Sequence, residues 1–302
     1  MKTNLNSNTL PTGESRRGAF ETYLQETGFK SQTVYQHRKY ASYFLAWIAE
    51  TSLALEQITY TEILDFADHL KKDNKNINLI NRMMLAVRYY FTYLQNEQQI
   101  SYNPAAGISL KGETRSIPHD LLEKAELEYL YESYEIKDER THRNKVIVGL
   151  LVYQALTREE LETIRPEHLK LREGKINVPK TGKQNDRILP LQPHQILDLQ
   201  EYILLIRPKL QNKSERLFTG RNDIENLKNS LLHLNHSLRK INPKYKHAVQ
   251  IRQSVITEWL KEKDLRTVQY MAGHRYVSST ERYQSSNLED LKEALSKHHP
   301  LR

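Results

Sequence analysis

Residues 251–284 read IRQSVITEWLKEKDLRTVQYMAGHRYVSSTERYQ, and this stretch decides the fold class. Apolar residues recur at spacings of three and four from Val255 to Leu260, which predicts a helix with one buried face. The short helix DLRTVQYMAGH closes at Gly273, a residue type that commonly follows a last helical turn. VSSTERY then predicts a new helix that begins from a Ser or Thr cap. Short turns therefore bring these helices together in one domain.

Three polar residues lie in this stretch at characteristic spacings. Arg252 lies in the first helix, His274 follows Gly273 22 residues later, and Tyr283 follows nine residues after that. This pattern strongly resembles the catalytic signature of tyrosine recombinases, the phage-integrase family. The resemblance implies a mainly α fold with a SAM-like, four-helix core-binding domain and a mixed, mostly α catalytic domain with a small β-hairpin or sheet. It also implies that Tyr283 cleaves DNA through a 3′-phosphotyrosyl intermediate and that Arg252 and His274 assist.

The chemistry of these residue types agrees with those roles. An arginine fork matches two nonbridging phosphate oxygens, so Arg252 is the natural donor to the phosphodiester. His274 either donates to the same phosphate or exchanges a proton with the phenol, because imidazole titrates near neutrality. Taken singly, each residue also has an ordinary structural explanation: Tyr283 is one of 18 tyrosines, which usually pack, and a helix arginine usually pairs with a carboxylate or solvent. The three residues together, at these two spacings, favour catalysis.

A second motif, PKTGKQNDRILPL, resembles the β-turn-β element that carries the family's catalytic lysine. Residues 175–178 and 187–190 alternate in and out, which predicts a β-hairpin. Lys180 is the candidate acid that protonates the departing 5′-oxygen. Lys183 and Arg187 are competitors for this role and candidate DNA contacts. The alternative is a hairpin that only holds the DNA backbone.

The first part of the chain also resembles the family. It looks like the family's N-terminal core-binding domain. ETYLQETGFKSQTVYQHRKYASYFLAWI and NLINRMMLAVRYYFTYLQNEQQISYNPAAGI carry the resemblance, and residues 20–103 show helical periodicity with candidate caps at Thr59 or Thr61 and at Asn76 or Asn78. Several basic residues are candidate phosphate contacts, although a solvated charged face explains any one of them equally well. They are Lys30, Arg38, Lys39, Lys71, Lys72, Arg82 and Arg88.

The chain departs from the family pattern at two positions. The family's first catalytic arginine precedes a short helix, and Thr157 occupies that position here, with Arg158 one residue later. Arg158 is therefore a candidate replacement, but it can equally be a first-turn surface residue that pairs with Glu159, Glu162 or solvent. Thr157 and Glu160 also match a capping box. At the second position, three residues before Arg252, Val249 replaces the usual His or Lys.

These features divide the chain into four parts. We expect a loose tail at 1–14, a DNA-binding domain at 15–107, a linker at 108–119 and a catalytic domain at 120–302. Within the last part, further helices are predicted at 121–131, 146–156, around Glu160, and at 195–206, 225–238, 250–262, 265–271 and 288–295. The segment at 288–295 presents three leucines on one face, and it docks either on a neighbouring protomer, as in family members, or on its own domain.

Composition narrows the function classes. The chain has 302 residues, 38% of them apolar, with no cysteine and a formal net charge of +8. The missing cysteines exclude disulfides and thiolate metal sites, and no metal-ligand spacing occurs, so we expect neither metal nor cofactor. No signal-peptide or membrane-spanning run is present, and a cytoplasmic location is expected. The positive charge suits a polyanionic partner but is also common in proteins that bind none, so double-stranded DNA is expected as the partner from the family resemblance.

The expected function is site-specific DNA recombination or integration. By family resemblance the chain would be a monomer when free and a homotetramer, or dimer of dimers, on DNA. A second interpretation, prompted by Thr157 and Val249, is a weak or inactive homologue that acts as a DNA-binding accessory protein. A third is a helical DNA-binding or scaffolding protein outside recombination, which the catalytic spacing disfavours.

Overall fold

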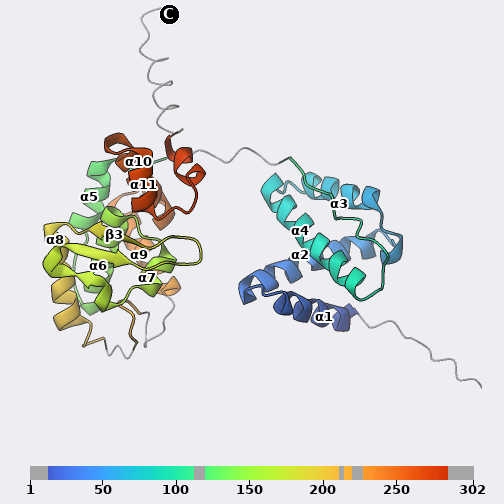
Figure 1. The fold of residues 1–302 in the computed structure, drawn as a ribbon, viewed down its shortest axis with the longest axis horizontal. Helices are drawn as coiled ribbons and strands as arrows, with labels where there is room; N and C mark the ends of the chain where they lie inside the picture. The colour runs from blue at the N-terminus through green and yellow to red at the C-terminus, as the bar shows by residue number, and fades with distance from the viewer. Residues whose placement is uncertain (1–12, 112–119, 211–213, 220–226, 285–302) are drawn as a thin grey trace, which may run out of the picture. The chain divides into compact units, whose positions relative to one another are not determined.

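The computed structural model describes residues 13–111, 120–210, 214–219 and 227–284 (Figure 1). Contacts divide the chain into two compact units, Met1–Ser116 and Ile117–Arg302. Within the described residues, no helix is both long and apolar enough to cross a membrane. The leucine-bearing segment predicted at 288–295 lies outside the described residues, as do most of the predicted tail and linker.

The described part of the N-terminal unit, residues 13–111, is built from four α-helices, as the sequence predicts. They are α1 (Gly13–Glu26), α2 (Ser31–Glu50), α3 (Tyr60–Lys72) and α4 (Ile77–Asn96), with a 3₁₀ turn η1 (Leu55–Gln57) before α3. Two of the predicted caps are confirmed. Thr59 and Glu62 form a capping box at the start of α3, and the Asn76 side chain accepts from the Leu79 backbone N–H at 2.8 Å at the start of α4.

Aromatic side chains form the centre of this unit. Phe44 of α2 packs against Phe66 of α3 and Phe91 of α4, with ring centroids 5.0 and 5.7 Å apart. All three rings are almost completely buried. Burying a phenylalanine contributes on the order of 2–3 kcal/mol, so these rings contribute substantially to the packing of the three helices.

The described residues of the C-terminal unit contain seven labelled α-helices and a further helical stretch at the end. They are α5 (Lys124–Glu132), α6 (Glu139–Gln154), α7 (Arg158–Thr163), α8 (Pro193–Glu201), α9 (Lys228–Ile241), α10 (Ala248–Glu262) and α11 (Leu265–Ala272). Shorter turns are η2 (Pro166–His168), η3 (Leu171–Glu173) and the π-helical η4 (Tyr202–Ile206). Residues 278–284 are helical at the end of the described chain. The start expected at 146 was wrong for α6, because Asp138 caps a helix that begins seven residues earlier, at Glu139, and its first turns carry polar residues.

A small antiparallel sheet lies among these helices, in the order β1-β2-β3. Strands β2 (Lys175–Val178) and β3 (Arg187–Pro190) confirm the predicted hairpin. The two-residue strand β1 (Leu169–Lys170) adds to its edge and is too short to show an alternating pattern. Val178 pairs with Arg187 and Ile176 with Leu189, so Arg187 begins the strand on its buried face.

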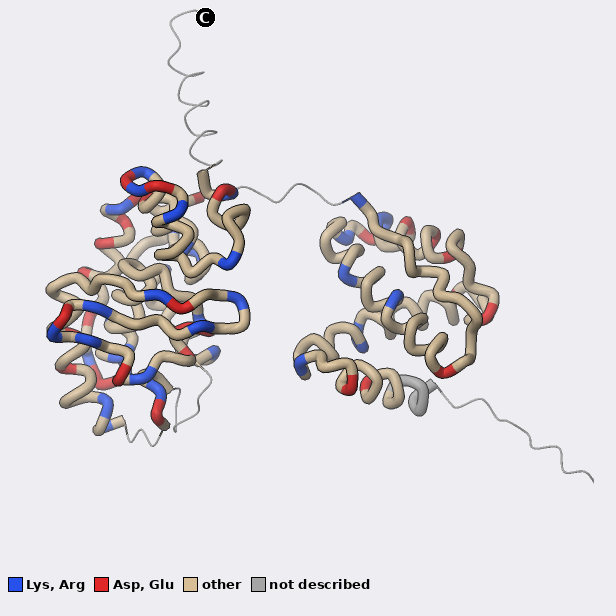
Figure 2. The backbone as a smooth tube through the Cα atoms, in the orientation of Figure 1, with Lys and Arg blue, Asp and Glu red and all other residues tan. Residues whose placement is uncertain are grey.

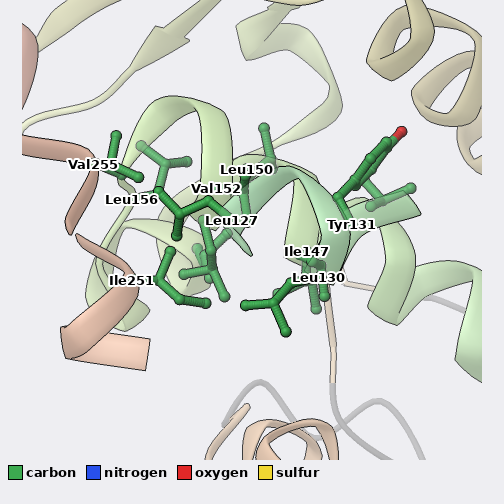
Figure 3. Packing of buried hydrophobic residues seen from close by; sticks show 14 of the residues in the cluster. Leu127, Leu130, Tyr131, Ile147, Leu150, Val152, Leu156, Ile251 and Val255 are labelled. Carbon is green, nitrogen blue, oxygen red and sulfur yellow. The ribbon is translucent and has the colours of Figure 1, made fainter. Parts of the chain in front are cut away.

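Helix α6 forms the centre of the C-terminal core, and Figure 3 shows part of this cluster. Leu127 and Leu130 of α5 pack on one side of it, while Ile251 and Val255 of α10 belong to the same buried cluster. The core thereby fixes α10, the helix that carries Arg252.

Candidate active site

Helix α10 is fixed at its start by side chains that bond to backbone atoms. The His247 Nδ1 accepts from the Gln250 backbone N–H at 3.1 Å and caps the helix. The Gln250 amide donates to the Asp120 carbonyl at 2.6 Å, and the Ser254 hydroxyl accepts from the Leu122 N–H at 2.8 Å. These bonds tie the first turns of α10 to the chain just before α5 and set the direction in which Arg252 points.

Arg252 points inward and bridges the ends of two other helices. Its Nη1 donates to the carbonyl of Ala155, which ends α6 in a left-handed conformation, and its Nη2 donates to the carbonyl of Ala272 at 2.6 Å. Arg252 is only 8% exposed, and burial lowers the pKa of its guanidinium while Glu160 opposes that shift. The guanidinium stays charged because arginine does not deprotonate in proteins.

His274 and Tyr283 lie against each other. Their rings are stacked with centroids 5.9 Å apart and an interplanar angle of 12°. The His274 Nδ1 lies 2.9 Å from the hydroxyl oxygen of Thr280, which is fully buried. The predicted helix closure is confirmed, because Gly273 adopts the left-handed conformation after α11. The Tyr283 residue is 4% exposed, so its phenol belongs to the interior of the site.

The environment keeps His274 neutral. Burial lowers the pKa of its imidazole to about 3, and the positive charges of Arg252, Arg187 and Arg282 add to that shift. Near neutral pH the ring therefore carries a single proton.

Arg282 contacts Tyr283, the candidate nucleophile, and was not singled out from the sequence. Its guanidinium carbon lies 5.2 Å from the centre of the Tyr283 ring, and Nη2 donates to the phenol oxygen at 3.4 Å. Its Nε is buried and has no hydrogen-bond partner among the described residues. The one sequence signal was its position immediately before Tyr283.

Thr157 and Glu160 form the capping box that the sequence suggested at the start of α7. The Thr157 backbone N–H donates to the Glu160 Oε2 at 2.7 Å, and the Thr157 hydroxyl lies 3.0 Å from the same oxygen. Glu160 is completely buried. Its other oxygen, Oε1, accepts from Arg187 Nη1 at 2.5 Å, while Oε2 lies 4.0 Å from Arg252 Nη1. One carboxylate therefore lies within ion-pair distance of two guanidinium groups.

Arg187 is not an exposed residue of the hairpin. Its side chain has no exposed surface, and its Nε donates to the carbonyl of Met271 at 2.7 Å. A guanidinium enclosed by protein cannot reach a phosphate without rearrangement, which holds for Arg187 as for Arg252, so the roles of Arg187 as a DNA contact and as a competitor of Lys180 stay predictions. The alternation along the strand already placed Arg187 on the same face as the buried Leu189.

The loop between β2 and β3 is attached to the turn that carries His274. The Asn185 N–H donates to the Gly273 carbonyl at 2.9 Å, and Gln184 pairs with His274 in an isolated β-bridge. Lys180 and Lys183 lie in this loop, and both are exposed. Figure 2 shows basic residues along this hairpin and on helices of both units. The attachment holds the loop of Lys180 beside the segment of His274.

Arg158, the candidate replacement for the first arginine, and Val249 both face solvent, whereas Thr157 is half-buried. Arg158 carries a side chain that is 55% exposed, and its Nε lies 3.5 Å from the Glu162 Oε1. The structure therefore shows the surface pairing that was the alternative to a catalytic role. Val249 is 60% exposed on the first turn of α10.

The candidate DNA contacts of the N-terminal unit divide into three groups. Lys30, Lys39, Lys72 and Arg82 are exposed. Lys71 pairs with Asp68, and Arg38 pairs with Glu21, each at 2.7 Å. Arg88 instead turns to the backbone: its Nε donates to the Ala105 carbonyl at 3.1 Å and its Nη2 to the Ile108 carbonyl. Arg88 thus holds the turn after α4, which accounts for its guanidinium without DNA.

Comparisons with known proteins agree with this arrangement. The model of the phage integrase family matches residues 120–290, and the model of the phage integrase N-terminal SAM-like domain matches residues 18–98. The tyrosine recombinase XerD of Vibrio cholerae serotype O1 is 27% identical over 300 residues, which cover 94% of this chain and 97% of that protein. The tyrosine recombinase XerC of Oceanobacillus iheyensis is 25% identical, with coverage of 93% and 94%.

The fold is also found among solved structures. The XerH site-specific recombinase bound to palindromic difH substrate, in a post-cleavage complex, has a TM-score of 0.74 and 17% identity, with coverage of 93% of this chain and 94% of that one. Because the phage integrase family model spans more than half of the sequence, this chain belongs to the phage integrase family of tyrosine recombinases.

Proposed function

We propose that this chain is an active DNA breaking-rejoining enzyme that works through Tyr283. The observation that carries the proposal is the contact between the stacked His274 and Tyr283 rings, enclosed by the positive charges of Arg252, Arg187 and Arg282. A merely structural tyrosine would have no need of a neutral imidazole and several guanidinium groups around it. Double-stranded DNA is the proposed substrate, and relatives of this fold are solved in complex with DNA.

In the proposed reaction the Tyr283 oxygen attacks the phosphorus of one DNA strand. The negative charge of the bound phosphate offsets the surrounding arginines and raises the pKa of His274, whose imidazole then takes the phenolic proton, while Arg252 binds the nonbridging oxygens where charge develops. The bond from phosphorus to the 5′-oxygen breaks, and Lys180 gives that oxygen a proton. The products are a 3′-phosphotyrosyl linkage and a free 5′-hydroxyl. Attack by a 5′-hydroxyl of another strand reverses the steps and joins the DNA, so neither metal nor nucleotide enters the balance.

Access to the reacting groups requires movement. Tyr283 is 4% exposed and Arg252 is 8% exposed, so a phosphodiester must displace neighbouring atoms before it meets both. Arg252 would exchange its bonds to the carbonyls of Ala155 and Ala272 for bonds to phosphate oxygens. The exposed Lys180 can reach DNA without such an exchange. Assembly on DNA as a homotetramer or dimer of dimers is part of the proposal, by analogy with the family.

A second candidate function rests on specific substitutions. Thr157 and Val249 replace two polar groups of the family's pattern, and losing one preorganised donor costs roughly a hundredfold to a thousandfold in rate. On this alternative the chain binds DNA as an accessory protein and cleaves it slowly or not at all.

The test begins with a random-sequence duplex library, from which the full-length protein enriches its own binding site. The enriched site is then rebuilt with a nick next to each candidate cleavage position, so that the released strand end diffuses away and the adduct is trapped. We expect the wild-type protein to form an SDS-resistant adduct and Tyr283→Phe to form none while binding the same DNA. Tyr276→Phe is the matched control, because Tyr276 is 66% exposed and seven residues away. Binding without any adduct would support the accessory function instead.

A further inference from the structure

A buried ion cluster lies beside the reacting groups, and the mechanism so far does not use all of it. Glu160, with no exposed surface, contacts Arg187 at 2.5 Å and lies 4.0 Å from Arg252. Its Oε2 is already occupied by the backbone N–H and hydroxyl of Thr157. The carboxylate therefore makes its close ionic contact with Arg187 and only a longer one with Arg252.

Arg187 is positioned from three sides. It begins β3, its Nε donates to the Met271 carbonyl near the end of α11, and its Nη1 reaches Glu160 in α7. A Cβ on Gly273 would lie 2.5 Å from the same Nη1, so the turn before His274 leaves room for this guanidinium only because residue 273 is glycine. The Arg187 Nη2 is buried without a hydrogen-bond partner among the described residues.

The charges of this cluster do not cancel. Two guanidinium groups and one carboxylate leave one excess positive charge in a buried site. If Glu160 had only Arg252 as its partner, the pair would be neutral, and the arginine that binds phosphate would be held by a carboxylate. With Arg187 in the closer contact, the charge of Glu160 is balanced before Arg252 is reached.

We propose that Arg187 is a positioning residue that neutralises Glu160 and so leaves the charge of Arg252 available to the scissile phosphate, compensating for the arginine that Thr157 replaces. The inference rests on the proposed function. Arg187 differs from Arg252 in its close ionic contact with Glu160, which direct binding of the phosphate through Nη1 would break, so the proposed role keeps that contact in place.

Removal of one or both charges tests this role. Arg187→Gln leaves Glu160 with Arg252 as its nearest cation, and we expect single-turnover cleavage to fall at least a hundredfold. Arg187→Gln combined with Glu160→Gln removes both charges, and cleavage should return to within about tenfold of the wild type. Arg187→Lys should fall between the two. Rates are compared at saturating protein, well below the melting temperature of every variant, so that lost stability does not imitate lost catalysis.

Arg143→Gln is the control for the loss of a buried arginine. Arg143 is 6% exposed in α6 and donates to the Thr219 carbonyl at 2.8 Å, outside the cluster. We expect this variant to melt earlier and to cleave at the wild-type rate. If the double variant is as slow as Arg187→Gln, charge neutralisation is not what Arg187 supplies, and the proposal fails.

The titration of His274 gives a readout that does not depend on cleavage. The groups facing this imidazole are Thr280, Tyr283 and Arg282 from the last helix, Arg252 from α10 and Arg187 from β3. In protein with ¹³C-labelled histidine, the resonance of His274 is identified by its loss in His274→Gln. We expect Arg187→Gln to raise the pKa of His274 and the double variant to lower it again.

The two readouts separate the two ideas. If the wild type forms no adduct but the titration shifts as expected, the electrostatic role of Arg187 stands and the proposed function fails. If the wild type cleaves DNA and Arg187→Gln changes neither cleavage nor titration, the proposed function stands and the role of Arg187 is overturned.

Discussion

The two sides of the site are stabilised in different ways. On the side of α10 and α11, backbone carbonyls of Ala155 and Ala272 fix Arg252, and all three residues of the family signature are present. On the side of α7 and β3, Thr157 replaces an arginine, and a buried pair between Arg187 and Glu160 occupies the region. The loss of an arginine at one sequence position therefore does not remove the positive charge from this side of the site, because β3 supplies another arginine, Arg187.

The largest expected effect comes from the side that keeps the family signature. Arg252→Ala removes the donor to the phosphate, and we expect cleavage to fall by about a thousandfold or more with DNA binding nearly intact. The measurement is single-turnover adduct formation on the nicked site. Arg252→Lys keeps a charge without the fork and should remain at least tenfold slow. If Arg252→Ala cleaves at near the wild-type rate, Arg252 is not the donor to the phosphate, and residues of α7 or β3 bind it instead.

The acid sensitivity of the fold tests the environment of His274. Its pKa is lowered to about 3 in the folded protein, against 6.5 when unperturbed, so below pH 6.5 the unfolded chain binds a proton that the folded chain refuses. The wild type should therefore lose about 2 kcal/mol of unfolding free energy between pH 7 and pH 5 beyond what His274→Gln loses. Urea unfolding at each pH measures the difference. Equal losses in the two proteins would mean that His274 titrates normally in the folded state.

A gain of function tests the side that lacks the arginine. Thr157→Arg adds a guanidinium next to the α7 start, and we expect cleavage to rise by roughly tenfold if the position still faces the phosphate. The same change removes a capping hydroxyl, which should cost about 1 kcal/mol of stability in a thermal melt. Thr157→Lys controls for added charge without the fork. A slower enzyme with an intact fold would show that the cluster around Glu160 no longer accepts a guanidinium there.

The smallest effect is expected at Arg158. Its side chain is 55% exposed and its partner Glu162 lies in the same helix, so Arg158→Ala should change cleavage less than threefold and stability by less than about 1 kcal/mol. The adduct assay and a thermal melt measure both quantities. A hundredfold loss of cleavage would restore Arg158 as the replacement for the first arginine.

Local patterns predicted much of the fold. The alternation that predicted β2 and β3 gave both strands with their observed bounds, and the caps at Thr59 and Asn76 follow from side chains that bond to nearby backbone atoms. The start of α6 was missed because its first turns bury polar residues such as His142 and Arg143, so apolar residues do not recur there at helical spacing.

The site was predictable only in part. The resemblance of their residue types and spacings to the signature of tyrosine recombinases singled out Arg252, His274 and Tyr283. The partnership of Arg187 with Glu160 joins residues 27 positions apart, and it depends on how α7 and β3 pack. Strand alternation indicates that Arg187 points inward, but no local pattern states which carboxylate it meets.

The central claim is that Tyr283 becomes covalently joined to DNA, and mass spectrometry of the trapped adduct tests it most directly. The adduct is digested with a protease and a nuclease, and the peptide that carries the remaining nucleotides is sequenced. The account predicts that the nucleotides are attached to Tyr283 through a 3′-phosphate. Attachment of the nucleotides to another residue would contradict the claim. So would the absence of any modified peptide when the protein binds the DNA and the DNA is nicked at every candidate position.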